Sequence, residues 1–391
     1  MGERIGLEVS LAVSEAAKLA RPDVIAAYPI TPQTHIVEEL SQMVADGDLD
    51  AEYIMVESEH SAMSACCGAA ATGARTFTAT ASQGLALMHE ILFIASGLRL
   101  PIVMVVANRA LSAPLSIWGD HSDVMSERDA GWIQLFAETG QEAFDLTVMA
   151  FKIAEDKRVL LPVEVNIDGF TLSHVVEPIE IESQADIDAF LPTYEPQVIL
   201  DPEKPVTIGP VGFPELYTEI KKQQNEALIG SYPVILEVWD EFTQKFGRTY
   251  RPVESYRTEG AEVLLNMAGA ISGTARVAID TMRDEGRKVG MIRTRLWRPY
   301  PFDDIRAAVK GVKAVAVVDR ALSFGGPGGP MCSELRSALY PLDEKPVVTG
   351  YVAGLGGRDV TIENFYEMVE DTEEVLKSGQ TQVYKMIGVR E

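Results

Sequence analysis

Short apolar runs alternate with segments of helical periodicity from residue 7 to about residue 170, and this alternation constrains the fold more than any other feature. The apolar runs have the length and composition of buried strands, and they lie at residues 24–28, 53–56, 76–80 and 101–106. Helical segments lie at residues 7–20, 32–44 and 83–98, and a further helix of small residues ends at residue 71. Repeated strand, helix and strand units predict an α/β fold built on an open parallel sheet with helices on both faces.

A second α/β pattern begins at residue 261. Strands are expected at residues 263–267, 290–295 and 314–319, with helices at 274–285 and 301–309 between them. The segment from 171 to 258 is less regular, with six prolines between residues 178 and 210, which predicts an extended arm with one helix at 214–227. We therefore expect two domains, at residues 1–240 and 241–391.

The charge of the chain limits its partners. The 391 residues include 58 acidic and 34 basic side chains, a formal net charge of −24 at pH 7. This excess argues against binding to nucleic acid or to an anionic membrane, because both need clustered Lys and Arg. No stretch approaches the ~20 apolar residues of a membrane span, and the first residues do not resemble a signal peptide. We expect a cytoplasmic protein.

The three cysteines, Cys66, Cys67 and Cys332, are too few and wrongly spaced for a disulfide framework, a zinc site or an iron–sulfur motif. Any cluster is therefore expected on another chain. The adjacent pair lies in an alanine-rich helical segment, where small thiols act as apolar packing groups.

Three polar residues follow predicted strands: Thr31, Glu59 and Arg109. Ligands of open parallel sheets bind beyond the carboxyl ends of the strands, so these residues are candidates for a site. Thr31 and Pro32 have the pattern of a helix N-cap and first helical residue, where an anion can dock, although Thr31 can also simply cap its helix. Arg109 can grip a carboxylate through two hydrogen bonds, or form a structural ion pair with an aspartate such as Asp120 or Asp123.

Other polar features are less specific. Glu59 in a first helical turn can merely complement the helix dipole. His60, His89 and His121 are possible acid–base groups, but a histidine in a cleft wall is more often a structural hydrogen-bonding residue. The glycine-rich segment at 325–330 contains prolines that cannot donate to a phosphate, so we expect a structural or interface turn.

Several motifs in chain order resemble one family. AYPITP at 27–32, VESEHSA at 56–62, TATASQGL at 78–85, and NRAL at 108–111 followed by SIWGDHSD at 116–123 are similar to the α subunit of pyruvate and related 2-oxoacid:ferredoxin oxidoreductases. The resemblance is dense to about residue 175 and looser beyond, where LWRPYP at 296–301 resembles a turn of transketolase C-terminal domains. It implies an open parallel-sheet thiamine diphosphate-binding domain of the pyrimidine type, plus a second, transketolase C-terminal-like α/β domain.

The resemblance also implies roles for single residues. Glu59 matches the carboxylate that binds the pyrimidine nitrogen of thiamine diphosphate, which activates the cofactor. Thr31 and Arg109 match residues that bind the substrate carboxylate, and Pro29 matches a residue packed near the cofactor. The family decarboxylates a small 2-oxoacid oxidatively and passes the electrons through iron–sulfur clusters to ferredoxin.

The chain lacks the motif that binds the diphosphate, a Gly-Asp-Gly followed by paired Asn. By resemblance, thiamine diphosphate is shared with a β subunit that holds Mg²⁺ and the diphosphate. The [4Fe-4S] clusters are expected on β and γ/δ subunits, in a dimer of hetero-oligomers.

The substrate is less constrained than the family. Pyruvate ranks first by prevalence. Oxalate follows closely, because residues 112–121 depart from the Pro-Pro-Trp-Ser-Val-Trp-Asp-Asp run associated with many pyruvate enzymes. The use of coenzyme A stays open. Two alternatives are a thiamine-dependent transketolase or decarboxylase component without cluster chemistry, and a noncatalytic scaffold subunit.

Overall fold

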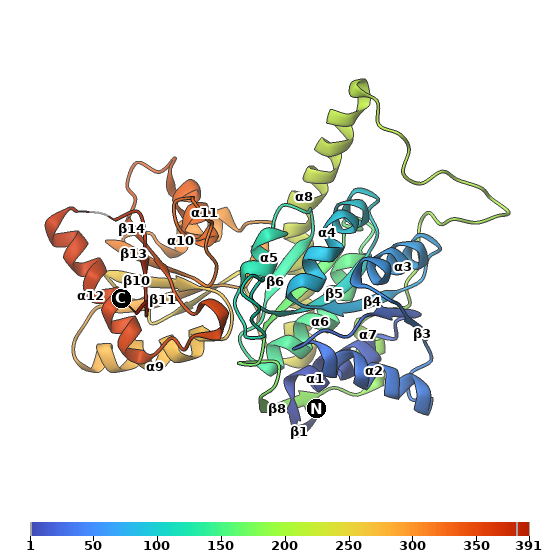
Figure 1. Cartoon of the computed structure of the whole chain (residues 1–391), viewed down its shortest axis with the longest axis horizontal. Coiled ribbons are helices and arrows are strands. Elements are labelled where there is room, and N and C mark those ends of the chain that lie inside the picture. The colour runs from blue at the N-terminus through green and yellow to red at the C-terminus, as the bar shows by residue number, and fades with distance from the viewer. Residues whose placement is uncertain (1, 381, 391) are drawn as a thin grey trace.

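The computed structural model describes residues 2–380 and 382–390, which form two α/β units side by side (Figure 1). The N-terminal unit is built on a seven-stranded sheet with the order β12-β6-β7-β5-β4-β2-β3. All neighbouring strands are parallel except β12, which runs antiparallel to β6. The strands are β2 (Val24–Ala27), β3 (Glu52–Met55), β4 (Thr76–Thr80), β5 (Ile102–Asn108), β6 (Ile133–Phe136), β7 (Val163–Asp168) and β12 (Leu296–Arg298).

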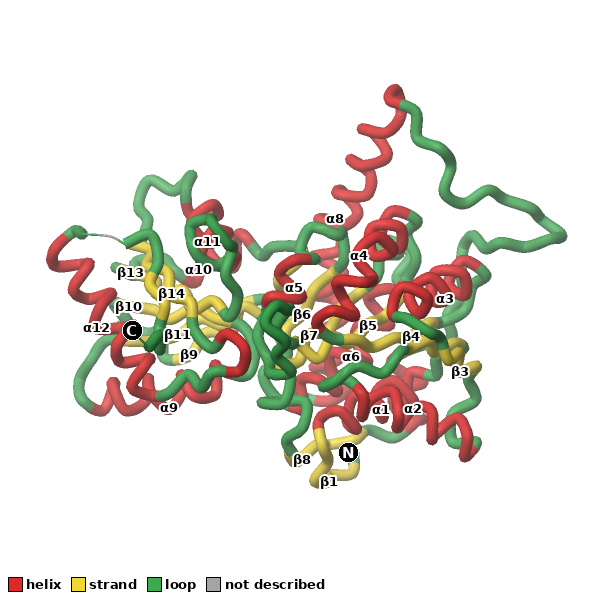
Figure 2. Tube along the Cα trace, in the orientation of Figure 1, coloured by secondary structure: helices red, strands yellow, loops and turns green. Residues whose placement is uncertain are grey.

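Helices cover both faces of this sheet, as the alternating sequence pattern predicts (Figure 2). One apolar core joins the sheet to α1 (Val9–Ala20), α2 (Thr34–Asp46) and α6 (Gly140–Glu155). A second core on the opposite face contains α3 (Glu59–Ala71) and α4 (Ser82–Gly97), with the short α5 (Ser122–Ser126) beside α4. A separate antiparallel pair joins β1 (Glu3–Glu8) to β8 (Val176–Ile181).

The C-terminal unit has a six-stranded sheet with the order β15-β14-β13-β10-β11-β9. Its strands are β9 (Val253–Tyr256), β10 (Val263–Met267), β11 (Val289–Thr294), β13 (Ala314–Asp319), β14 (Val347–Val352) and β15 (Lys385–Met386). Only β9 pairs antiparallel with its neighbour. The helices are α9 (Ile271–Asp284) and α12 (Ile362–Ser378) on one face, α10 (Phe302–Ala308) and α11 (Pro330–Leu339) on the other, and the short η1 (Leu355–Gly357).

The helix expected at 214–227 is longer in the structure and continues to residue 246. After α7 (Gln184–Phe190), the chain forms an extended arm and then α8 (Pro214–Phe246), which contains Pro233 in its interior. Beyond that proline, apolar residues at helical spacing such as Val238 and Phe242 are buried against the first core, and this burial outweighs the hydrogen bond lost at Pro233. The arm and the first turns of α8 project from the body (Figure 1). The domain boundary expected at 240–241 falls inside α8.

No helix in the described part of the chain combines the length and apolarity needed to cross a bilayer.

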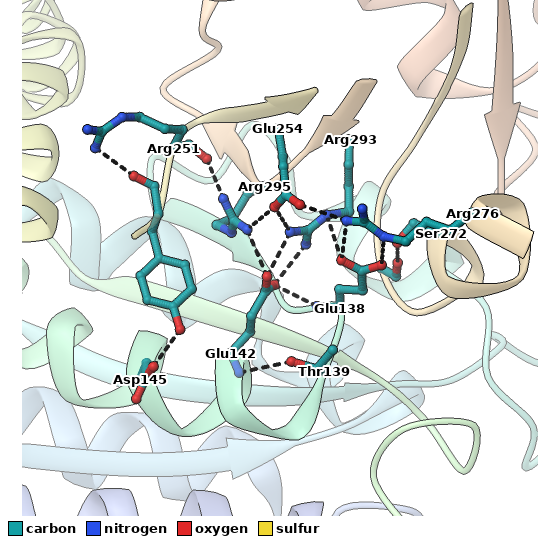
Figure 3. Close-up of polar contacts among 12 residues, drawn as sticks. Glu138, Thr139, Glu142, Asp145, Arg251, Glu254, Ser272, Arg276, Arg293 and Arg295 are labelled. Atoms are coloured by element: carbon teal, nitrogen blue, oxygen red, sulfur yellow. Dashed lines mark hydrogen bonds and ion pairs between the residues drawn. The ribbon is translucent and has the colours of Figure 1, made fainter. Parts of the chain in front are cut away.

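The two units meet at a buried network of carboxylates and guanidinium groups (Figure 3). Glu142 of α6 accepts hydrogen bonds from Arg293 at 2.8 and 2.7 Å and from Arg295 at 2.7 Å. Glu254 of β9 pairs with both arginines, and Arg276 bridges Glu254 and Glu138. Side chains from both units therefore neutralise one another where they are removed from water, as burial of charge requires.

The charges of this network change its acid–base behaviour. Burial opposes ionisation of the Glu142 carboxyl, but the neighbouring Arg295 and Arg293 lower its pKa to about 2. The same arginines lower the pKa of Glu254 to about 2 against the effect of burial. Since the pKa values are depressed in the folded protein, the network stabilises the fold fully above pH 4.5, the ordinary pKa of Glu. This contribution is lost as the pH falls from 4.5 towards 2.

Replacement of Glu142 by Gln should lower the free energy of unfolding at pH 7 by about 3 kcal/mol, because it removes one of the carboxylates that neutralise the buried Arg293 and Arg295. The difference from the unaltered protein should shrink between pH 4.5 and pH 2, where the Glu142 carboxyl loses its charge. Urea denaturation at several pH values measures both effects.

Glu237→Gln is the matched control. Glu237 pairs with Arg158 at 2.7 Å, but its side chain is 52% exposed, so its loss should cost less than ~1 kcal/mol. Equal losses for the two variants would contradict a stabilising role for the buried network.

Candidate active site

The residues expected at the site follow neighbouring strands of the first sheet. β3, β2, β4 and β5 are adjacent and parallel, so their carboxyl ends lie along one edge. Pro29 and Thr31 follow β2, Glu59 follows β3, Ser82 follows β4 and Arg109 follows β5. The edge of the sheet thus gathers polar groups from four chain segments, as the strand order requires.

Glu59 is the first residue of α3 and is only 6% exposed. Ser58 caps the helix by accepting a hydrogen bond from the Ser61 amide at 3.2 Å. In the described part of the chain, no donor forms a hydrogen bond to the Glu59 carboxylate. The Thr80 hydroxyl, at the end of β4, is also buried, and it has no hydrogen-bond partner among the described residues. Buried polar residues in proteins normally have partners, so the Glu59 carboxylate indicates a place for a ligand.

Gly84 makes the room in which the Glu59 side chain lies. A Cβ atom at position 84 would lie 2.7 Å from Glu59 Oε1 and 2.4 Å from Thr80 Oγ1, closer than real contacts permit. The absence of a side chain at Gly84 therefore brings the start of α3 against the start of α4.

Arg109 is also 6% exposed, and its guanidinium contacts carbonyl groups. Nη1 donates to the Thr31 carbonyl at 2.8 Å and Nε donates to the Ser116 carbonyl at 2.8 Å. Burial lowers the pKa of Arg109, and the charge of Asp123 opposes this shift. No ion pair joins the Arg109 side chain to a carboxylate within residues 2–380 and 382–390, so its charge is available to an anion.

The expected structural ion pair of Arg109 with Asp120 or Asp123 is not formed. Asp120 instead accepts hydrogen bonds from Ser122, at 2.6 Å from its hydroxyl and 2.9 Å from its amide, and from the Gly356 amide at 2.9 Å. Asp123 binds the backbone amide of Arg109.

The prediction that Thr31 caps α2 is wrong. The helix begins at Thr34, with Gln33 in the cap position, and the Thr31–Pro32 peptide is cis. The Gln33 amide donates to the Ile30 carbonyl at 2.8 Å and the Ile30 amide donates to Gln33 Oε1 at 3.2 Å, which closes a turn before the helix. Thr31 and Pro29 are exposed at the edge of the sheet.

Only some of the expected site residues contact one another directly. Thr31 and Arg109 touch, whereas Glu59 contacts the turn at Gly84. No hydrogen bond or ion pair between Glu59 and Arg109 is found among the described residues. These groups would therefore contact different parts of a ligand that lies along the edge.

His60, His89 and His121, the three histidines considered as acid–base groups, each lie near a carboxylate. Buried His121 contacts Asp168 through Nε2 at 2.9 Å, and Asp168 also binds Arg320 of the C-terminal unit. His89 pairs with Glu127, and His60 lies 3.8 Å from Glu90. These contacts favour structural roles for the histidines.

The glycine-rich segment is a structural turn, as expected. It leads into α11, where Asp319 accepts hydrogen bonds from the amides of Met331 at 2.7 Å and Cys332 at 3.0 Å. A side chain at Gly329 would overlap Asp319, with its Cβ 1.9 Å from Cγ. The protein's own carboxylate therefore occupies the helix start that a phosphate would need.

The cysteines and possible metal ligands are accounted for by local contacts. Cys66, Cys67 and Cys332 are free, and burial raises the pKa of each thiol to about 12, so they stay protonated at neutral pH. The sequence did not predict that His35 would contact Glu8 at 2.6 Å or that its ring would lie 4.6 Å from the ring of His174. His174 Nδ1 lies 2.8 Å from the Ser173 hydroxyl, so hydrogen bonds already explain this cluster.

Comparison with protein families identifies the class of protein. A model described as the thiamine diphosphate-binding part of pyruvate flavodoxin/ferredoxin oxidoreductase matches residues 15–238, and one for core domain II of pyruvate:ferredoxin oxidoreductase matches residues 261–365. The chain therefore belongs to the 2-oxoacid:ferredoxin oxidoreductase family, whose members are oxidoreductases acting on 2-oxoacids.

Particular relatives are similar over nearly the whole chain. Pyruvate synthase subunit PorA of Methanothermobacter thermautotrophicus is 50% identical over 94% of both chains. PorA of Methanocaldococcus jannaschii is 52% identical over 93% of both. Ketoisovalerate oxidoreductase subunit VorA of Pyrococcus horikoshii is 44% identical over 94% of this chain and 93% of its own. The family expected from the motifs is confirmed, and its match to the α subunit is supported by these relatives.

Solved structures support the expected fold. The chain matches 2-oxoglutarate:ferredoxin oxidoreductase from Magnetococcus marinus with a TM-score of 0.70 and 21% identity, over 95% of this chain and 65% of that one. A split-gene transketolase matches with a TM-score of 0.56 and 11% identity, over 94% of this chain and 98% of that one. The expected α/β fold with two thiamine-enzyme-like units is confirmed.

Gly84→Ala tests whether the Glu59 carboxylate binds the cofactor. The added Cβ must displace Glu59 or Thr80, and we expect thiamine diphosphate to bind the assembled complex at least about tenfold more weakly, or ~1.4 kcal/mol. Isothermal titration of the cofactor-depleted complex measures this change.

The control is Gly68→Ala in the same helix as Glu59, since a Cβ at position 68 would meet no atom within 4 Å. It should leave the cofactor affinity unchanged. If Gly84→Ala also binds the cofactor normally, Glu59 does not lie in the thiamine site.

Proposed function

We propose that this chain is the α subunit of a 2-oxoacid:ferredoxin oxidoreductase that uses thiamine diphosphate to decarboxylate a small 2-oxoacid oxidatively, with pyruvate ranked first. The observation that carries the proposal is that the Glu59 side chain is buried with no donor to its carboxylate among the described residues, at the same carboxyl-end edge of the sheet that carries the Arg109 guanidinium. The similarity to pyruvate synthase PorA over nearly the whole length supports the same function.

The surroundings of Glu59 suit the pyrimidine part of thiamine diphosphate. A carboxylate that has no hydrogen-bond partner within the described chain matches a ring nitrogen that carries a proton. When bound, thiamine diphosphate supplies a thiazolium carbon that adds to the 2-oxo group and accepts the electrons left when carbon dioxide departs.

Glu59 would hold a proton on the pyrimidine nitrogen, in a position where burial strengthens the interaction. Arg109 would bind the substrate carboxylate, because its charge is available and its position is fixed by the carbonyls of Thr31 and Ser116. The exposed Thr31 hydroxyl would add a hydrogen bond to the same carboxylate. Pro29, exposed beside it, would pack against the cofactor.

The rest of the cofactor set would lie on partner chains. Three free cysteines cannot hold a [4Fe-4S] cluster, which has four cysteine ligands. We infer a β subunit with Mg²⁺, the diphosphate and a cluster, γ/δ subunits with further clusters, ferredoxin as acceptor, and a dimer of hetero-oligomers. We also propose two domains, at residues 1–240 and 241–391, and a cytoplasmic location. The acidic net charge supports the further proposal that the protein binds neither nucleic acid nor membrane.

Pyruvate is a better substrate candidate than oxalate. Relatives that span the chain are named as pyruvate and ketoisovalerate enzymes, whose substrates carry an apolar group beside the 2-oxo carbon. The segment that departs from the common pyruvate motif carries the exposed Leu115, Ile117 and Trp118, none of which has a positive charge to pair with a second carboxylate. Apolar residues suit a methyl group better than a charged one.

A substrate screen of the purified complex with a one-electron acceptor, with and without coenzyme A, tests the proposal. We expect the highest turnover with pyruvate and reduction of ferredoxin by a brown, cluster-bearing complex. Oxalate turnover without coenzyme A would instead identify an oxalate enzyme. A colourless complex that transfers its intermediate to a carbon acceptor would indicate a transketolase-type component.

Glu59→Gln should lower turnover by about 100-fold or more while the complex still assembles, because an amide cannot replace the carboxylate in proton transfer. Glu57→Gln is the control, since Glu57 lies two residues away and is exposed. Steady-state kinetics and size-exclusion chromatography make the comparison. Full turnover of Glu59→Gln would favour the noncatalytic scaffold.

A further inference from the structure

The Asp123 carboxylate of α5 is fully buried and accepts four hydrogen bonds. Oδ2 accepts from the amides of Ser82 at 3.0 Å and Arg109 at 2.9 Å. Oδ1 accepts from the Val124 amide at 2.8 Å and from Asn108 Nδ2 at 3.2 Å. Each oxygen has two donors, so the ionised carboxylate is satisfied by polar groups of the chain alone.

The two donors to Oδ2 come from different strand ends. Ser82 begins α4 directly after β4, and Arg109 follows β5. A second bond joins the same ends, since the Ser82 hydroxyl donates to the Ala110 carbonyl at 2.7 Å. Ser82 has a φ of 47°, a left-handed conformation that is unfavourable for serine and that these bonds stabilise.

These bonds link the two halves of the candidate site. Gly84, in the same helical turn as Ser82, lies against Glu59, whereas Arg109 carries the guanidinium proposed to bind the substrate. A shift of Ser82 relative to Arg109 would therefore change the separation between Glu59 and the carboxylate-binding group.

Holding a carboxylate here has a cost. Burial raises the pKa of Asp123 to about 7, although the amides of Arg109, Ser82 and Val124 oppose the shift. In the described residues, no cationic side chain forms an ion pair with it. An asparagine of the same size would avoid this cost, but it has one acceptor oxygen in place of two.

We propose that Asp123 is a positioning residue for the 2-oxoacid, which fixes Arg109 against the β4–α4 turn at the distance that the substrate and cofactor require. This inference rests on the proposed function of the site. It assigns no direct contact between Asp123 and the substrate.

Asp123→Asn tests the proposal in the assembled complex. The amide group cannot accept hydrogen bonds, so one pair of donors loses its partner, and we expect the KM for pyruvate to rise about tenfold or more. Ser82→Ala removes the hydroxyl contacts with the Ala110 carbonyl and with Gln83 Oε1 but keeps the Ser82 amide bond to Asp123. It should raise the KM by a smaller factor, so it tests the same link if Asp123→Asn does not fold.

Asp319→Asn is the matched control. Asp319 is also buried, accepts backbone amides at a helix start, and has its pKa raised to about 7 by burial, but it lies in the other sheet. It should lower thermal stability to a similar degree and leave the KM unchanged. A merely structural role for Asp123 predicts the same result for both aspartates.

The outcomes separate two failures. An active complex in which Asp123→Asn and Ser82→Ala keep the KM of the unaltered protein would overturn the positioning role alone. A wild-type complex that reduces no acceptor with any 2-oxoacid would overturn the proposed function, and the positioning role with it.

Discussion

Parallel pairing of the central strands is the constraint on which the site depends. Hydrogen-bonded strands lie ~4.8 Å apart, so the segments that follow β3, β2, β4 and β5 emerge side by side at one edge. A carboxylate, a hydroxyl and a guanidinium that are far apart in sequence become neighbours without any long loop. The sheet fixes the order of these groups, and the turns that follow it fix their depth: Glu59 and Arg109 are buried, whereas Thr31 is exposed.

The second unit stabilises the first through shared charge and shared strand pairing. β12 comes from the C-terminal half but pairs with β6 at the edge of the N-terminal sheet. The buried pairs of Glu142 and Glu254 with arginines lie between the units, as does the contact of Arg320 with Asp168. Because a buried charge needs its partner, separation of the units would expose several of these charges to water or leave them buried without a partner. Both halves of the chain therefore contribute to the stability of the N-terminal unit.

The sequence predicted the repeating elements best. The strands at 76–80, 263–267 and 314–319 have the limits that the pattern indicated, because each is a continuous apolar or β-branched run bounded by polar or turn residues. The same method failed where the environment decided the conformation. α8 continues past Pro233 because a distant core buries its apolar face, and α2 starts late because the Gln33 side chain closes a turn. β12 is a three-residue strand whose partner lies about 160 residues away, which no local pattern reveals.

The sequence alone determined the fold class, the family, and the residue types at the strand ends, because these follow from periodicity and from motifs of consecutive residues. Only the tertiary structure decided which groups touch: Arg109 binds the Thr31 and Ser116 carbonyls and forms no aspartate pair, and Gly84 opens the space for Glu59. The position of Asp123 between two strand ends was likewise decided only by the tertiary structure. Such contacts join segments separated by tens of residues, and their geometry depends on how the helices pack on the sheet, which local sequence does not encode.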